Sequence, residues 1–180
     1  DVVELVVQKP AANPFAGGFR FDVAAGNTVP RVASSRGLFR YPDPADADAT
    51  VGQDIDLQQA FVSYVAPVAR GLKFDAGKFV THTGMELIPG HDGFNDNASR
   101  SLLFGFAIPF THTGLKMTYA WSDSISTQVM ITNGWDNVHD NNSGKSLGLQ
   151  IAWTSSPVAL YFNYMGGPEQ DNSERMRQIF

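Results

Sequence analysis

The fold is decided by residues 113–165, which read TGLKMTYAWSDSISTQVMITNGWDNVHDNNSGKSLGLQIAWTSSPVALYFNYM. Four segments of this stretch alternate strictly between an apolar side chain and a polar or small one. On the apolar side of the alternation, fifteen of sixteen positions are apolar or aromatic, and the exception is Thr127. Because successive side chains of a strand point to opposite faces, this period of two predicts four β-strands, each with one apolar face.

The connections between these strands alternate in length. Short turns at 122–124 and 155–157 flank a long polar run at 134–145, and seven consecutive connections of the chain keep this order of short and long. A soluble β-sandwich has no reason to place every long loop at one end, whereas an outer-membrane barrel has short periplasmic turns and long extracellular loops. A strand of about 10 residues, tilted near 40°, also rises about 25 Å, the height of the apolar band of such barrels.

We therefore predict an all-β fold, an up-and-down antiparallel transmembrane β-barrel in which residues 1–180 form a single domain or a segment of a larger barrel. Loop 81–111 is too long for an ordinary connection, and its second half is too hydrophobic to lie in water, so we expect it to fold back into or against the barrel. Residues 173–180 resemble the start of a ninth strand. The other expected strands lie near residues 2–8, 18–26, 56–66, 71–80, 112–121, 124–133, 146–155 and 157–165, and the expected long loops are 27–54, 81–111 and 134–145.

The composition agrees with a membrane barrel. The chain has 180 residues, of which 43% are hydrophobic and 17% are charged, with a net charge of −5. No run approaches 18 apolar residues, which does not exclude a membrane, because barrel strands distribute their apolar residues by alternation. The absence of cysteine excludes disulfide scaffolds and thiolate metal sites, and the mild acidic balance argues against nucleic acid as a partner.

Several motifs in the middle of the chain resemble one known family. They are DLQQAFVSYV at 56–65, AGKF at 76–79, the run from Ser99 to Gly114, NGWDN at 133–137 and GPEQ at 167–170. Together they resemble the OmpL-like β-barrel porin family of Gram-negative bacteria, over roughly residues 50–175. The resemblance implies an outer-membrane barrel, surrounded by lipid and lipopolysaccharide, that acts as a diffusion channel. Members of the family are longer than this chain, so we expect the 180 residues to be part of a larger barrel.

The polar side of the alternation predicts which residues line the lumen. If the apolar face meets lipid, the polar face must point inward, because a Lys or Arg on the lipid side costs about 2–4 kcal/mol at the bilayer midplane. In a wide barrel these residues would line water and set charge preference, whereas in an eight-stranded barrel they would pair with one another and fill the lumen. The predicted lumen-lining residues are Arg20, Asp22, Gln59, Lys73, Asp75, Lys116, Gln128, Gln150 and Asn163.

Two further sets of residues have expected positions in the barrel. In loop 81–111, we expect His82, Glu86 and Arg100 to lie at the narrowest point of the lumen. Aromatic residues near the ends of the expected strands suit the membrane–water interface. This second set consists of Tyr119, Trp121, Trp153 and Tyr164.

The sequence contains few signals for an enzyme. The motif Gly-x-Ser-x-Gly is absent, and the four histidines (His82, His91, His112 and His139) lack the close spacing of a zinc site. We therefore predict no catalytic residues, no metal site and no cofactor. The run Asp136–Asn142 offers carboxylate and amide oxygens that calcium could use, but it lacks the spacing of an EF-hand loop, so calcium binding by residues 136–142 is left open.

The predicted function is that of an outer-membrane porin-like channel for the passive diffusion of small polar solutes or ions. Two alternatives stay open. One is a structural barrel or sheath in an outer-membrane complex, and the other is a soluble β-sandwich that binds a ligand and buries the same apolar face against a second sheet. A homo-oligomer or a larger membrane complex is also left open.

Overall fold

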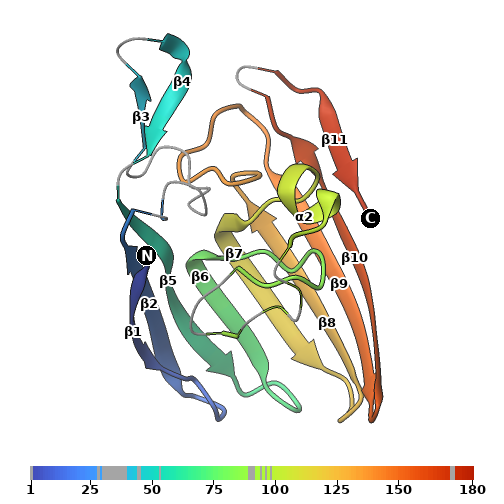
Figure 1. The fold of residues 1–180 in the computed structure, drawn as a ribbon. Helices are drawn as coiled ribbons and strands as arrows, with labels where there is room; N and C mark the ends of the chain where they lie inside the picture. Colours follow the sequence, from blue (N-terminus) through green and yellow to red (C-terminus); the bar gives the residue numbers. More distant parts are fainter. Residues whose placement is uncertain are drawn as a thin grey trace.

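One antiparallel sheet of nine strands forms the frame of the molecule (Figure 1). The computed structural model describes residues 2–27, 29, 40–43, 46–52, 54–88, 92–93, 95, 97, 99–170 and 173–180. Each strand of the large sheet pairs with the next one along the sheet, in the order β1-β2-β5-β6-β7-β8-β9-β10-β11. The strands are β1 (Val3–Lys9), β2 (Gly17–Ala25), β5 (Ile55–Ala66), β6 (Leu72–Val80), β7 (Thr111–Ala120), β8 (Ile125–Thr132), β9 (Ser146–Ser155), β10 (Val158–Pro168) and β11 (Met176–Ile179).

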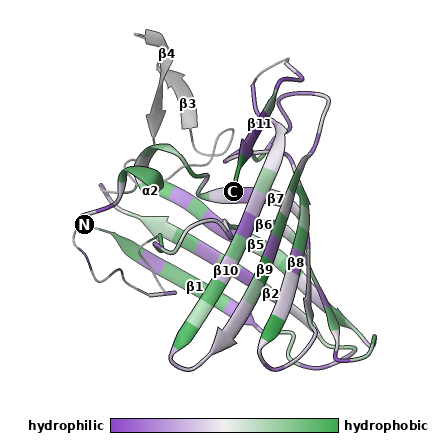
Figure 2. Ribbon diagram, turned by 90° about the vertical axis from the view of Figure 1, so that its right-hand side faces the viewer, coloured by the Kyte–Doolittle hydropathy of each residue, from purple (hydrophilic) through white to green (hydrophobic). Residues whose placement is uncertain are grey.

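The sheet is curved and open (Figures 1 and 2). In the described part of the chain, β1 and β11 are its edges, and each has one hydrogen-bonded neighbour. The sandwich alternative requires a second sheet packed on the apolar face. In the described part of the chain, no second sheet covers that face. The prediction of an all-β, up-and-down antiparallel fold is confirmed. None of the described helices is both long and apolar enough to cross a membrane.

Two of the expected loops contain regular structure. The range 27–54 includes a two-stranded hairpin of β3 (Arg40–Asp43) and β4 (Asp46–Gly52). Its Pro and Asp residues hide the alternation on which a strand prediction depends. The range 81–111 includes the short helix α2 (Leu102–Phe106), whose five residues are too few to show a helical period.

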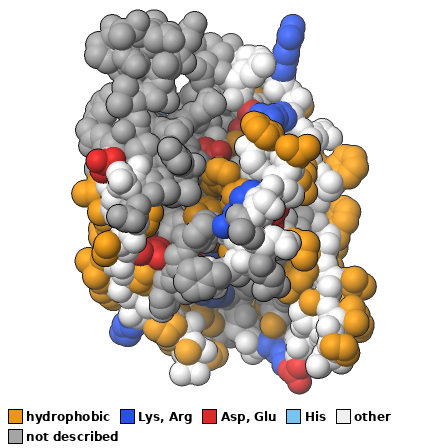
Figure 3. Space-filling view, in the orientation of Figure 1, with side chains coloured by type: hydrophobic (Ala, Val, Ile, Leu, Met, Phe, Trp, Pro, Cys, Tyr) orange, Lys and Arg blue, Asp and Glu red, His pale blue; other side chains and the backbone are white. Residues whose placement is uncertain are grey.

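The two faces of the sheet differ in chemistry. The outer, convex face presents exposed apolar side chains along seven of the long strands, among them Leu5, Phe21, Val62, Leu115, Ile131, Ile151 and Leu160. The alternation of hydropathy along β8, β9 and β10 is visible in Figure 2. The inner, concave face is polar, with Asp22, Gln59, Asp75 and Thr132 all buried. Figure 3 looks onto this side of the molecule, and hydrophobic side chains project at its flanks.

The strand register arranges the concave face in rows that run across the sheet. The end of the sheet with the long connections is named the loop end, and the end with the short connections is named the turn end. Three rows are named in order from the loop end to the turn end. The upper row is Gly77, Gly114, Thr132 and Ser146, with Gly167 against Ser146; the middle row is Asp75, Lys116, Met130, Gly148 and Met165; and the amide row is Lys73, Thr118, Gln128, Gln150 and Asn163.

Residues 81–110, named here the inward segment, return over the concave face (Figure 1). The two ends of the segment meet, since Thr81 N donates to Phe110 O at 2.8 Å. Between them, the segment contacts β10 through His82 and β2 through Asp92. The segment therefore lies against the sheet at two distant strands, in the inward position that its length and hydrophobicity predicted.

Candidate functional site: the polar concave face

The first polar cluster joins β2 to the inward segment. Arg20 donates from Nε to both carboxylate oxygens of Asp22, at 2.9 and 2.8 Å, and from Nη1 and Nη2 to the two oxygens of Asp92, at 2.7 and 2.8 Å. Gln59 Nε2 donates to Asp22 Oδ2 at 2.7 Å. Asp22 is completely buried. One guanidinium between two carboxylates leaves a net charge of about −1 in this cluster at neutral pH.

The second cluster lies in the middle of the sheet and has the opposite balance. Asp75 accepts a hydrogen bond from Ser63 Oγ at 2.5 Å, and it pairs with Lys73 Nζ at 3.0 Å and with Lys116 Nζ at 3.3 Å. The ammonium of Lys116 also lies over the rings of Phe79 and Phe61, 4.5 and 5.6 Å from their centroids, where the ring faces attract a cation. Two ammonium groups share one carboxylate, so this cluster carries about +1.

The third group consists of amides. Gln150 Nε2 donates to Asn163 Oδ1 at 2.8 Å and to the backbone oxygen of His82 at 3.1 Å. Gln128 lies directly opposite Gln150 across the β8–β9 pair. All nine residues expected in the lumen thus lie on the concave face, in three groups. Their role in a water-filled lumen stays a prediction.

His82 fixes the start of the inward segment to the sheet. Its Nε2 lies 3.1 Å from the backbone oxygen of Tyr164. The ring rests on Gly148, where a Cβ would lie 3.1 Å from His82 Cε1 and 2.5 Å from Met130 Cγ. Burial lowers the pKa of His82, although the nearby backbone oxygens of Tyr164 and Leu149 oppose the shift. The imidazole is therefore neutral where it meets the sheet.

Glu86 and Arg100 occupy a different part of the inward segment from His82. Glu86 accepts hydrogen bonds from the Ser101 backbone N, at 3.1 Å, and from Ser101 Oγ, while Ser101 Oγ caps α2 by accepting from Phe104 N. These donors lower the pKa of Glu86. Arg100 lies over the Phe104 ring, 5.5 Å from its centroid. Both side chains line a cavity of about 600 Å³ beside α2, so they contact the helix while His82 contacts the sheet. The constriction role of the three residues stays a prediction.

The aromatic residues expected at the interface divide between the two ends of the sheet. Trp121 and Trp153 lie at the turn end and are exposed. The ring of Tyr119 meets that of Trp121 edge-on, with centroids 4.8 Å apart, and Trp121 Nε1 donates to Thr127 Oγ1 at 3.0 Å. Tyr164 lies farther along β10, opposite Leu149, and its hydroxyl extends toward Gly166 at the loop end. Their contact with the membrane interface stays a prediction.

Several polar residues that position the inward segment or hold the loop after β8 carry no recognisable signal in the sequence. Asp136, with a φ of 59°, accepts hydrogen bonds at Oδ1 from Phe110 N and Thr111 N, at 2.8 and 2.9 Å. Glu169 accepts from Trp135 N at 2.6 Å and from Ser146 Oγ at 2.5 Å. Asp92 is the partner of Arg20. Each contact joins residues more than 20 positions apart, which no local pattern reveals.

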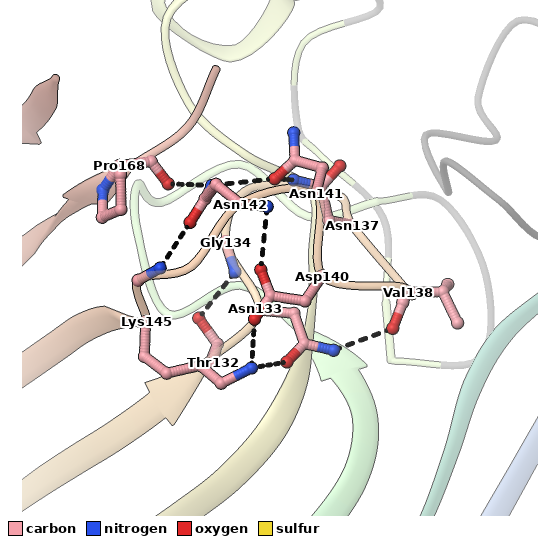
Figure 4. Close-up of polar contacts among 11 residues, drawn as sticks. Thr132, Asn133, Gly134, Asn137, Val138, Asp140, Asn141, Asn142, Lys145 and Pro168 are labelled. Atoms are coloured by element: carbon pink, nitrogen blue, oxygen red, sulfur yellow. Dashed lines mark hydrogen bonds and ion pairs between the residues drawn. The ribbon is translucent and has the colours of Figure 1, made fainter. Parts of the chain in front are cut away.

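The loop between β8 and β9 is held by its own side chains (Figure 4). Lys145 Nζ donates to Asn133 Oδ1 at 3.0 Å and to Asp140, and Asn142 Nδ2 donates to the backbone oxygen of Pro168 at 2.9 Å. Of the oxygens that could have served calcium, Asp140 Oδ2 accepts from the Lys145 ammonium, and Asn141 Oδ1 accepts from the side-chain amides of Asn137 and Asn142. Across the described ranges, no group of three or more His, Cys, Asp or Glu residues is placed to hold a metal ion.

Comparison with known proteins gives one match. A family model described as "Putative beta-barrel porin-2, OmpL-like" matches residues 2–180, the whole chain except its first residue. No curated protein and no solved structure matches the chain.

Proposed function

Since the chain belongs to the OmpL-like β-barrel porin family, whose members lie in the outer membrane of Gram-negative bacteria, we propose that its concave face lines a water-filled channel for the passive diffusion of small polar solutes or ions. One observation carries the proposal. The sheet presents an apolar face outward and a charged, hydrogen-bonded face inward. This is the division that a barrel between lipid and water needs.

The inward segment supports a narrow channel. Its His82 ring lies against Gly148 of the middle row, and Thr132, Ser146, Met130 and Met165 of the upper and middle rows are each no more than 1% exposed. The amide row beneath it is only partly covered. A segment that fills part of the lumen restricts passage to small solutes, as constrictions in pores do.

The same burial favours a second candidate, a closed structural barrel. Where the inward segment meets the sheet, side chains fill the space between them, so a lumen closed at this level would not conduct. A homo-oligomer, lipopolysaccharide contacts and a larger membrane complex are compatible with both candidates.

Single-channel recording separates the two candidates. We expect the detergent-purified, heat-modifiable protein to produce stable conductance steps in a planar lipid bilayer, because water reaches the amide row. A heat-denatured sample of the same preparation is the control. A correctly folded protein that inserts without conductance steps would contradict the channel and favour the structural barrel.

A further inference from the structure

On the concave face of the described strands, the charge between the inward segment and the turns comes from one residue. Lys73 is the only charged member of the amide row, whose other members are Thr118, Gln128, Gln150 and Asn163. Toward the turns, the next row on the same face is Ala120, Ser126, Ala152 and Tyr161, which is uncharged. On the concave face of the described strands, no carboxylate lies between the amide row and the turns.

The charge of Lys73 is not cancelled by its partner. Lys73 shares Asp75 with Lys116, so the three groups sum to about +1. The side chains of Asp75 and Lys116 are 2% and 16% exposed, whereas that of Lys73 is 39% exposed. The buried pair of Asp75 and Lys116 neutralises itself beneath the inward segment. The surplus positive charge is therefore most accessible at Lys73, the most exposed of the three side chains.

The neighbours of Lys73 can complete an anion site. Amide nitrogens and hydroxyl groups donate hydrogen bonds, and an ammonium group has three donors of its own. Gln128 and Thr118 lie on the two strands that follow Lys73 in the row. A small anion beside Lys73 would meet one cation and several neutral donors.

We propose that Lys73 and the amide row form a binding site for small oxyanions, such as carboxylates, on the turn side of the inward segment. The site gives the channel a local preference for anions over cations at this level. This inference rests on the proposed channel function and specifies the class of solute that the channel favours.

Ion selectivity tests the site in the whole protein. The permeability of acetate and of chloride relative to potassium would be measured from the reversal potential in tenfold gradients of the potassium salts. Exchanging a positive for a negative charge about 8 Å from a permeating ion should lower its relative permeability about threefold after screening at 0.1 M salt. We expect this loss in K73E, a smaller loss in K73Q, and wild-type selectivity in K73R.

Two further variants locate the effect. R70Q removes another cation, which lies on the turn after β5 and pairs with Asp123. Because Arg70 is not a member of the amide row, the ion selectivity of R70Q should match that of the wild type. Q128L keeps the charge of the site but removes a donor, so it should lower acetate permeability more than chloride permeability. If Q128L lowers the permeability of acetate and of chloride equally, the proposed role of the amide row in binding oxyanions is overturned.

The possible outcomes distinguish failure of the anion site from failure of the proposed channel function. A wild-type protein without conductance overturns the channel and the site together. A conducting wild type whose reversal potentials are unchanged by K73E overturns the anion site alone and leaves the channel intact.

Discussion

Among single residues, Asp22 shows how burial and ion pairing act together. Its buried carboxylate receives hydrogen bonds from Arg20 and Gln59, and Arg20 also holds Asp92 of the inward segment. A buried carboxylate with a paired guanidinium is costly to neutralise, because its partner is left with a weaker acceptor. This cluster therefore couples the stability of β2 to the position of the inward segment.

We expect Asp22→Asn to lower the free energy of unfolding by about 1–3 kcal/mol, since Arg20 keeps Asp92 but loses one charged acceptor. The midpoint of urea unfolding of the detergent-folded protein, followed by tryptophan fluorescence, measures the effect. The matched control is Asp123→Asn, which removes the carboxylate of an exposed ion pair with Arg70 and should leave the midpoint in place. Equal midpoints for the two variants would show that burial of Asp22 contributes nothing.

At the same scale, the sequence predicts the face of a residue better than its partner. Alternation puts the nine lumen candidates on one face, and a strict period of two puts Lys78 on the opposite face from Gly77. The structure instead buries Lys78, with its Nζ donating to Leu57 O and lying 3.7 Å from Asp56. The preceding residue, Gly77, has a φ of 135°, in a region that other residues rarely adopt.

Among the elements, the inward segment depends on the protonation of His82. The neutral ring contacts the Tyr164 oxygen through Nε2, and Nδ1 is buried without a partner in the described part of the chain. His112 and Lys116 of β7 are the titratable and charged groups that contribute to its electrostatic environment. A proton added to His82 would therefore be buried near another base and a cation.

Because burial lowers the pKa of His82 in the folded state, its contribution to stability is fully present above about pH 6.5, the ordinary value, and is lost as the pH falls toward the lowered value. We expect limited proteolysis within residues 81–110 to accelerate severalfold between pH 7.5 and pH 5. His82→Gln keeps a donor for Tyr164 but does not titrate, so its cleavage rate should be the same at both pH values. A wild-type rate that does not change with pH would contradict the dependence on His82.

Elements with a regular period were predictable, and the contacts between distant elements were not. The strands follow from alternation, and the return of residues 81–110 follows from their length and hydrophobicity. The seat of His82 on Gly148 joins residues 66 positions apart, and the Arg20–Asp92 pair spans 72. A single sequence contains no information about such pairs, because each residue taken alone is an ordinary loop or strand residue.

For the whole molecule, the difference between its two faces predicts opposite responses to charge. Val129 and Gln128 are adjacent in β8, so they lie on opposite faces near the middle of the sheet. Val129→Lys should lower the stability of the protein in lipid bilayers by about 2–4 kcal/mol, whereas Gln128→Lys should be tolerated. Folding titrations in lipid vesicles, read from heat-modifiable mobility on gels, measure both variants. Equal destabilisation by the two would contradict the assignment of the convex face to lipid.

The number of strands also restricts which strands can pair with the two edges of the open sheet. Because nine strands alternate in direction, β1 and β11 run the same way. A direct pair between these two edges would be parallel. To close the sheet with every pair antiparallel, an odd number of further strands would have to lie between β11 and β1.

The inward segment has a mechanical consequence as well. It is tied to β2 by Asp92 and to β10 by His82, so it spans the curved sheet as a chord spans an arc. The curved sheet therefore cannot become flatter or more curved unless the contact of Asp92 or that of His82 breaks. The residues that tie the inward segment to the sheet would therefore also hold the wall at a constant radius.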